Sequence, residues 1–323
     1  MLFRSIWFEP EMISPDSDLF RTHPDWALQI PGQEITQSRA QYVLDLSRQE
    51  IVDAVYHMIS AILHEADISY VKCDMNRQLT TMGSKMLASD RQGELYHRYM
   101  LGVYQMQERL CREFPELLLE NCSGGGARFD PGMLYYSPQI WCSDDTDAVE
   151  RLMIQEGTSL IYPLSCMGAH VSVCPNHIVG RNTPFTTRGT VALSGTFGYE
   201  LDITKASEEE KQEIKRQIEL YHKIQPLISK GDYYRLQSYS ENREEDSWMV
   251  VGKDKKNAVL FHVQVMAKPN VKSRFLKLQG LHPEWDYLVN DHVYTGAVLM
   301  YAGMKLPALQ GDFGSMLVEI RAV

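Results

Sequence analysis

The sequence is poor in positive charge and contains no long apolar run. Its 323 residues carry 32 Lys and Arg against 42 Asp and Glu, for a net charge of −10. Nucleic acids and anionic membranes attract a cationic face, so neither is an expected partner. No apolar stretch is long enough to span a membrane, and MLFRSIWFEPEM lacks the apolar region and cleavage site of a signal peptide. We therefore expect a cytoplasmic protein with a neutral substrate.

Cysteine is scarce, and its spacing excludes the commonest redox motif. None of the six cysteines forms a C-x-x-C pair, which favours reduced thiols. Cys166, His170, Cys174 and His177 do give C-x3-H-x3-C-x2-H, a spacing similar to that of zinc ligands. The glycine cluster 124–126 lacks the G-x-x-x-x-G-K-[ST] pattern, so it is not a phosphate-binding loop.

The first part of the chain alternates between strand and helix patterns. Expected strands cover 2–8, 68–74, 116–122, 138–143 and 158–163, and expected helices cover 41–66, 92–113, 147–157, 183–198 and 207–229. This order predicts parallel βα units with polar segments after each strand, at the face where barrel active sites lie. About six strand–loop units are present, whereas a closed (β/α)8 barrel needs eight.

The pattern changes after residue 230. Strands are expected at 231–238, 247–253, 257–265, 274–280 and 314–322, with turn signals between them. Short strands at close spacing predict an antiparallel β-sandwich. We therefore expect an α/β chain with a TIM-type (β/α)8 barrel domain at 1–229 and a small antiparallel β-sandwich domain at 230–323.

Two aspartates end predicted strands of the barrel. In VKCDMNR, Lys72 and Asp74 are two residues apart and share one face of a strand. Asp144 ends another predicted strand. Two carboxylates at one barrel mouth are the minimum requirement for glycoside hydrolysis. Spacing alone leaves the alternatives open, because Asp at such positions also caps helices and Lys72 could form a structural salt bridge.

Several longer motifs carry a resemblance. IWFEPEMISPDSDLFRTHPDWAL, VKCDMNR, ENCSGGGARFDPGMLYY, PQIWCSDDTDAVERL, YPLSCMGAHVSVCPNH and RGTVALSGTFGYELD occur in this order. Together they resemble the α-galactosidases of glycoside hydrolase family 36. The resemblance implies Asp74 as nucleophile and Asp144 as acid/base, with Lys72 binding sugar hydroxyls and keeping Asp74 ionised. It also implies a sugar pocket formed by Trp7, Arg39, Lys72, Asn76, Cys122 and Gly124.

The implied function is retaining hydrolysis of terminal α-D-galactosyl residues from raffinose- or melibiose-type oligosaccharides. Alternatives are an α-N-acetylgalactosaminidase, a galactosyl-transferring enzyme, or a truncated non-catalytic fragment. Two carboxylates suffice for the chemistry, so we expect no cofactor and no metal, and the resemblance needs neither Cys166 nor Cys174 as a ligand. It also implies a homotetramer.

One departure from the family concerns the N-terminus. Family members carry an N-terminal β-sandwich, two earlier barrel strands and a D-D-G-W type motif that binds galactose hydroxyls. The only Asp-Asp pair here is 144–145. The resemblance therefore implies a barrel that begins at its third strand, incomplete at its N-terminus, and weak or absent activity of this chain alone.

Overall fold

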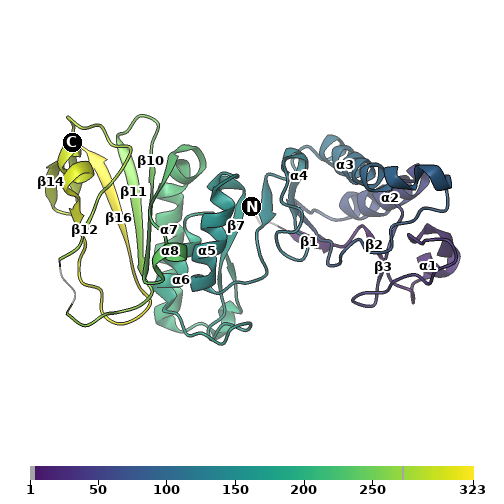
Figure 1. Cartoon of the computed structure of the whole chain (residues 1–323), viewed down its shortest axis with the longest axis horizontal. Coiled ribbons are helices and arrows are strands. Elements are labelled where there is room, and N and C mark those ends of the chain that lie inside the picture. Colours follow the sequence, from purple (N-terminus) through teal and green to yellow (C-terminus); the bar gives the residue numbers. More distant parts are fainter. Residues whose placement is uncertain (1–3, 271–272) are drawn as a thin grey trace. The chain divides into compact units, whose positions relative to one another are not determined.

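The computed structural model describes residues 4–270 and 273–323, which form two compact units (Figure 1). The first unit ends at Asp144, and the second begins at Asp145. The second unit holds the end of the predicted barrel domain together with the whole predicted sandwich domain, so the boundary between residues 229 and 230 stays a prediction. No helix in the described ranges is both long enough and apolar enough to cross a membrane.

A parallel sheet of four strands organises the first unit, in the order β1-β4-β5-β6. The strands are β1 (Ser5–Phe8), β4 (Tyr70–Cys73), β5 (Leu118–Asn121) and β6 (Gln139–Trp141). Their register pairs Trp7 with Lys72, Lys72 with Glu120, and Glu120 with Gln139. Paired residues of parallel strands point to the same side, so these four side chains form one row across the sheet. We call Trp7, Lys72, Glu120 and Gln139 the polar row.

The opposite face of this sheet is covered by two helices. Helix α2 (Gln49–Glu65) and helix α3 (Leu95–Glu113) pack against each other (Figure 1). Val71, Cys73 and Leu119 of the strands share one buried core with apolar residues of both helices. Because strand side chains alternate, the polar row faces away from the helices. The polar row is therefore separate from the core that the helices share with the sheet.

The predicted helix over 41–66 begins later than expected. Tyr42–Val43 forms β3, which pairs with β2 (Met12–Ile13), and the helix starts only at Gln49. Leu44 and Leu46 are nevertheless almost fully buried. A buried loop therefore produced the helical spacing of apolar residues in this segment. The other helical elements of the unit are α1 (Asp18–Thr22), α4 (Pro131–Tyr136) and the 3-10 turns Pro24–Trp26 and Ser89–Glu94.

The second unit continues the strand–helix alternation with two parallel strands, β7 (Met167–Ser172) and β8 (Thr196–Glu200). Its helices are α5 (Ala148–Ser159), α6 (Phe185–Ala192) and α7 (Glu208–Lys230), with short 3-10 turns at Leu164–Cys166 and Ile203–Lys205. Helix α7 begins with a capping box in which Ser207 and Glu210 satisfy each other's backbone N–H groups. Counted over the described residues, the two units hold six parallel strands, in agreement with the sequence count.

One predicted element of this unit is wrong, and another is too long. The strand predicted at 158–163 is the end of α5 and a turn, where Leu160 and Ile161 are 62% and 78% exposed. The helix predicted at 183–198 ends at Ala192, and strand β8 follows it. Short apolar runs satisfy helix, strand and loop patterns alike, and their type depends on which face the rest of the fold covers.

An antiparallel sheet of six strands forms the C-terminal part, in the order β14-β13-β16-β11-β10-β9. The strands are β9 (Asp232–Gln237), β10 (Glu245–Val251), β11 (Asn257–Gln264), β13 (Asp286–Val289), β14 (His292–Thr295) and β16 (Gly314–Ala322). One face packs against α6 and α7, and the other packs on the small pair β12 (Phe275–Leu276) and β15 (Met304–Lys305) (Figure 1). The predicted antiparallel β domain is thus present, with three strands (β13, β14 and β15) that the sequence patterns missed. The short helix α8 (Tyr239–Asn242) and the π-helical turn Val298–Ala302 complete it.

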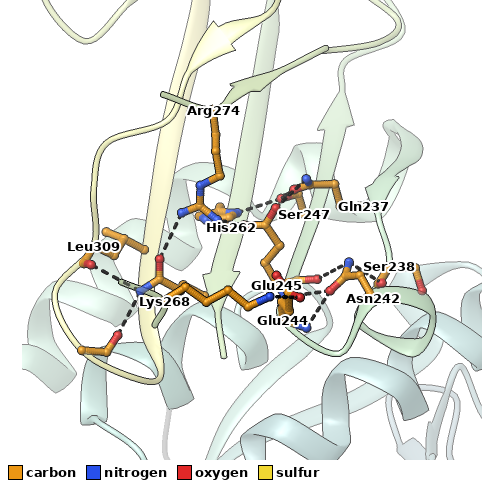
Figure 2. A network of polar contacts seen from close by, with 12 residues as sticks. Gln237, Ser238, Asn242, Glu244, Glu245, Ser247, His262, Lys268, Arg274 and Leu309 are labelled. Atoms are coloured by element: carbon orange, nitrogen blue, oxygen red, sulfur yellow. Dashed lines mark hydrogen bonds and ion pairs between the residues drawn. The ribbon is translucent and has the colours of Figure 1, made fainter. Parts of the chain in front are cut away.

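A buried polar network closes one end of this β core (Figure 2). Ser247 Oγ lies 2.8 Å from Nδ1 of His262 and donates to Gln237 at 2.8 Å. Arg274 pairs with Glu245 and donates to Gln264 Oε1 at 3.0 Å. Burial lowers the pKa of His262 to about 4, so the imidazole is neutral at pH 7. The network therefore contains a neutral histidine, which contacts the Ser247 hydroxyl through Nδ1.

Candidate active site

The first unit brings three loops together at the carboxyl end of its parallel sheet. Asp74 follows β4, the glycine cluster follows β5, and Asp144 follows β6. Two hydrogen bonds connect the first two loops, because the Cys122 backbone N–H donates to Cys73 O at 2.8 Å and the Ser123 side-chain hydroxyl donates to Met75 O at 3.0 Å. The carboxyl end of parallel strands is where active sites form in barrels.

Asp74 is buried, and neutral donors hold its carboxylate. It is 6% exposed. Trp7 Nε1 and Asn76 Nδ2 donate to Oδ2 at 3.3 and 2.8 Å, and the Met75 backbone N–H donates to Oδ1 at 2.8 Å. The structure therefore brings together three residues that the resemblance assigned to the site, Trp7, Asp74 and Asn76. These three donors fix the orientation of the carboxylate.

Lys72 lies on the same face as Asp74, as predicted, but its ion-pair partner is Glu120. Lys72 Nζ is 3.0 Å from Glu120 Oε1 and 5.1 Å from the centre of the Trp141 ring. Burial is the largest single effect and lowers the pKa of Lys72, but the charge and hydrogen bond of Glu120, with smaller contributions from Cys122 and Asp74, together outweigh it, so the net pKa is raised. Among the charges that raise it, Asp74 contributes less than Glu120. That Lys72 binds sugar hydroxyls and keeps Asp74 ionised therefore stays a prediction, and the structure adds that the ion-pair partner of Lys72 is its cross-strand neighbour Glu120.

Three aspartates follow β6, and their hydrogen bonds differ. Asp147 is the N-cap of α5, where its side chain accepts the N–H groups of Val149 and Glu150. Asp145 accepts the Asp147 N–H at 3.0 Å. Asp144 is exposed, and its carboxylate has no hydrogen-bond or ion-pair partner among the described residues. The helix-capping alternative thus applies to Asp147, and Asp144 remains available for proton transfer.

The glycine cluster packs closely against the Asp144 loop. A Cβ on Gly125 would lie 2.9 Å from Asp144 N and 2.9 Å from Ser143 Cα, and its φ is +86°. Gly124 also has a positive φ, +53°, but a Cβ there would meet no atom within 4 Å. At position 125, both the crowding and the left-handed backbone favour glycine. At position 124, only the left-handed backbone favours it.

Alanine at position 125 is expected to cost clearly more stability than alanine at position 124. Gly124→Ala adds only left-handed strain, roughly 1–2 kcal/mol. Gly125→Ala adds the same strain and also displaces the backbone of residues 143 and 144. Urea unfolding of both variants measures the difference, and equal losses would contradict the close packing. Displacement of Asp144 should also reduce any activity of the Gly125 variant.

The remaining predicted pocket residues are placed differently. Cys122 is buried beside Asp74; burial first, and then the Asp74 charge, raise the pKa of its thiol to about 12, so it is a neutral wall of the site. Arg39 is exposed in a turn with φ +52°, and its side chain has no polar partner among the described residues. The structure therefore groups Cys122 with Asp74 and does not group Arg39 with it.

Sequence reasoning missed several acidic residues around the site. Asn76 Nδ2 donates to Glu9 Oε1 at 2.8 Å as well as to Asp74, so one amide bridges two carboxylates. Glu11 is 2% exposed and pairs with Arg128. Glu120 is 3% exposed. The available signal was a charged residue inside an apolar or aromatic segment, as in LLLEN and FEPEM, because such a charge is buried only with a partner.

The proposed zinc-like spacing does not create a cluster. Cys166 Sγ contacts Pro163 O at 3.0 Å, while Cys174 lies near Asn182, and His170 approaches Glu200 at 3.9 Å. Across residues 4–270 and 273–323, no three His, Cys, Asp or Glu side chains are arranged to hold a metal ion.

Comparison with known proteins matches both parts of the chain to one group of enzymes. The family model Melibiase matches residues 1–231, and the model for the glycosyl hydrolase family 36 C-terminal domain matches residues 245–320. The chain is 50% identical over 319 residues to alpha-galactosidase AgaA of Geobacillus stearothermophilus, covering 98% of this chain and 44% of the relative. It is 46% identical over 320 residues to alpha-galactosidase Mel36A of Lactobacillus acidophilus, covering 98% of this chain and 43% of the relative. The chain thus spans less than half the length of these curated relatives.

Solved structures agree with the sequence relatives. The crystal structure of GH36 alpha-galactosidase AgaB from G. stearothermophilus superposes with a TM-score of 0.96 at 51% identity, over 99% of this chain and 44% of that one. An AgaA variant in complex with raffinose superposes with a TM-score of 0.97 at 50% identity, over 100% of this chain and 45% of that one. The parallel strands correspond to part of a TIM-type barrel, and the antiparallel sheet to the C-terminal β domain. By sequence, fold and family models alike, the chain belongs to glycoside hydrolase family 36.

Proposed function

We propose that this chain forms the part of a retaining α-galactosidase that supplies both catalytic carboxylates. The observation that carries the proposal is the Asp74 carboxylate, buried at a strand end and held by three N–H donors, in a chain of this family. Asp144 lies on the loop after β6. It is exposed and has no polar partner among the described residues. One carboxylate is fixed, and the other is available to exchange protons.

In the proposed reaction, Asp74 attacks the anomeric carbon while the bond from that carbon to the leaving oxygen breaks. Asp144 gives its proton to the leaving oxygen. Water then attacks the galactosyl–Asp74 ester, Asp144 takes the proton of that water, and Asp74 is released. This double displacement requires the two carboxyl groups about 5–5.5 Å apart.

The proposed substrates are oligosaccharides with a terminal α-galactose. Close relatives have been solved with raffinose and with stachyose. Hydrolysis of an N-acetylgalactosaminide is the alternative, and Cys122 argues against it: a buried thiol beside Asp74 leaves little room for an N-acetyl group.

Release of p-nitrophenol from its α-galactoside and its α-N-acetylgalactosaminide tests the proposal. Because no D-D-G-W motif is present, we expect the purified chain to be weakly active, with a clear preference for the galactoside. Full activity of the isolated chain would refute the expected need for the missing motif. Preference for the N-acetyl sugar, or no turnover even of the more reactive 2,4-dinitrophenyl galactoside, would refute the proposed function of this chain.

A further inference from the structure

Glu120 is a buried carboxylate that the proposed reaction does not use. It lies on β5 in the polar row and is 3% exposed. Lys72 Nζ is 3.0 Å from Oε1, and Gln139 Nε2 and the Tyr70 hydroxyl both donate to Oε2. Oε1 lacks a hydrogen bond of good geometry, so the ammonium charge of Lys72 compensates it. Residues of three adjacent strands therefore converge on this one carboxylate.

The same contacts fix the Lys72 ammonium from two sides. Glu120 binds it on one side, and the Trp141 ring lies 5.1 Å away on another. An ammonium has three N–H donors, and the ion pair with Glu120 leaves some of them for other acceptors. A long, flexible side chain is thereby held in one position at the sugar-facing side of the sheet.

The pairing also changes the charge near Asp74. The titratable groups around Lys72 are Tyr70 and Asp74 on its own segment and Glu120 and Cys122 from the β5 segment, while β1 and β6 present the neutral side chains Trp7, Gln139 and Trp141. Glu120 is thus the strongest charge acting on Lys72. A neutralised ion pair exerts a much weaker field on Asp74 than a free ammonium would.

We propose that Glu120 is a positioning residue for the reaction proposed above: it holds the Lys72 ammonium in place and cancels most of its charge at Asp74. The first role, holding Lys72, does not depend on the proposed function, whereas the second role, acting on the charge at Asp74, rests on it. An uncompensated ammonium would over-stabilise the Asp74 carboxylate and weaken it as a nucleophile. With Glu120 present, Lys72 can donate hydrogen bonds to sugar hydroxyls, while neutral N–H groups set the environment of Asp74.

The first test needs no turnover. Trace acetylation with acetic anhydride across a pH series, read by peptide mass spectrometry, gives the titration of Lys72 and of the exposed Lys85 in the same molecules. In Glu120→Gln, Lys72 is expected to titrate lower by about one pH unit or more, because an opposite charge at this distance shifts a pKa by one to three units. Lys85 should not move. An unmoved Lys72 overturns the proposal.

Two further variants serve as a matched control and as a substitute should Glu120→Gln fail to fold. Glu113→Gln makes the same chemical change at the exposed partner of His64 and should leave Lys72 unmoved. If Glu120→Gln does not fold, Glu120→Asp keeps the charge, lengthens the pair, and should shift Lys72 in the same direction by less. A shift of equal size in Glu113→Gln would contradict a specific Glu120–Lys72 pair.

The second test reads the consequence for Asp74. The pH profile of kcat/KM for 2,4-dinitrophenyl α-galactoside is compared between the natural chain and Glu120→Gln. The unpaired ammonium should lower the pKa of Asp74, so the acidic limb should move to lower pH; a general structural defect would lower the rate at every pH without moving the limb. An unmoved limb, with Lys72 shifted, refutes the link to Asp74. No turnover by the natural chain refutes the proposed function, while the Lys72 titration still decides the pair.

Discussion

Asp74→Gly is expected to reduce hydrolysis of 2,4-dinitrophenyl α-galactoside on the order of 10⁴-fold or more, by analogy with the loss of other enzymatic nucleophiles. The reason is that Trp7, Asn76 and the Met75 N–H hold the Asp74 carboxylate at the strand end, and glycine removes that carboxylate. Removing the side chain also leaves a space for a small anion. Azide should therefore restore turnover and give β-galactosyl azide, because it attacks from the side that Asp74 occupied.

Asp144→Ala provides the matched comparison, because it should leave the nucleophile in place. With a reactive leaving group the galactosyl–Asp74 ester still forms, and azide then attacks it from the opposite side. The expected product is α-galactosyl azide. Asp145→Asn, which changes the neighbouring acid, should have a much smaller effect on rate. The same azide anomer from both variants would contradict the assigned roles.

The second large effect concerns stability: Arg128→Met is expected to destabilise the first unit by about 3–5 kcal/mol. Glu11 is 2% exposed, and Arg128 Nη1 donates to its Oε2 at 2.9 Å, while the Tyr99 hydroxyl donates to the same oxygen at 2.5 Å. The contact joins the loop after β1, helix α3 and the loop after the glycine cluster. Removing the guanidinium leaves a buried carboxylate without a counter-charge.

Denaturant unfolding of three variants measures this effect. Arg112→Met breaks an exposed i,i+4 pair with Glu108 on α3 and should cost under about 1 kcal/mol. The double variant Glu11→Met with Arg128→Met should be more stable than Arg128→Met alone, because it removes the unpaired charge as well. Similar losses for Arg128→Met and Arg112→Met would show that the buried pair is not a strong stabilising contact.

Part of the site could be predicted from the sequence, because side chains alternate between the two faces of a β-strand. The two-residue spacing of Lys72 and Asp74 predicts a shared face, and the structure agrees, because Trp7, the register partner of Lys72, donates to Asp74. Trp7 and Asn76 also lie against Asp74. The family resemblance supplied what spacing could not, the choice of Asp74 as nucleophile and of Asp144 over its neighbour Asp145 as acid/base, and these roles stay predictions.

What the sequence did not reveal depends on contacts between distant segments. The partner of Lys72 is decided by strand order and register, which place Glu120 directly opposite it from 48 residues away. Similarly, Leu160 and Ile161 have the composition of a strand, yet the sheet uses Met167–Ser172 instead. Intrinsic preference is a weak guide wherever tertiary packing selects among short apolar runs.

The most direct test of the central claim is to trap the galactosyl–enzyme ester. 5-Fluoro-α-galactosyl fluoride should label the chain once, and trypsin should release the label on residues 73–77, CDMNR, whose only side-chain carboxyl group is that of Asp74. We expect the added mass on this peptide and its absence in Asp74→Gly. Labelling of the tryptic peptide that carries Asp144 instead, with residues 73–77 unmodified, would contradict the assignment of Asp74 as the nucleophile.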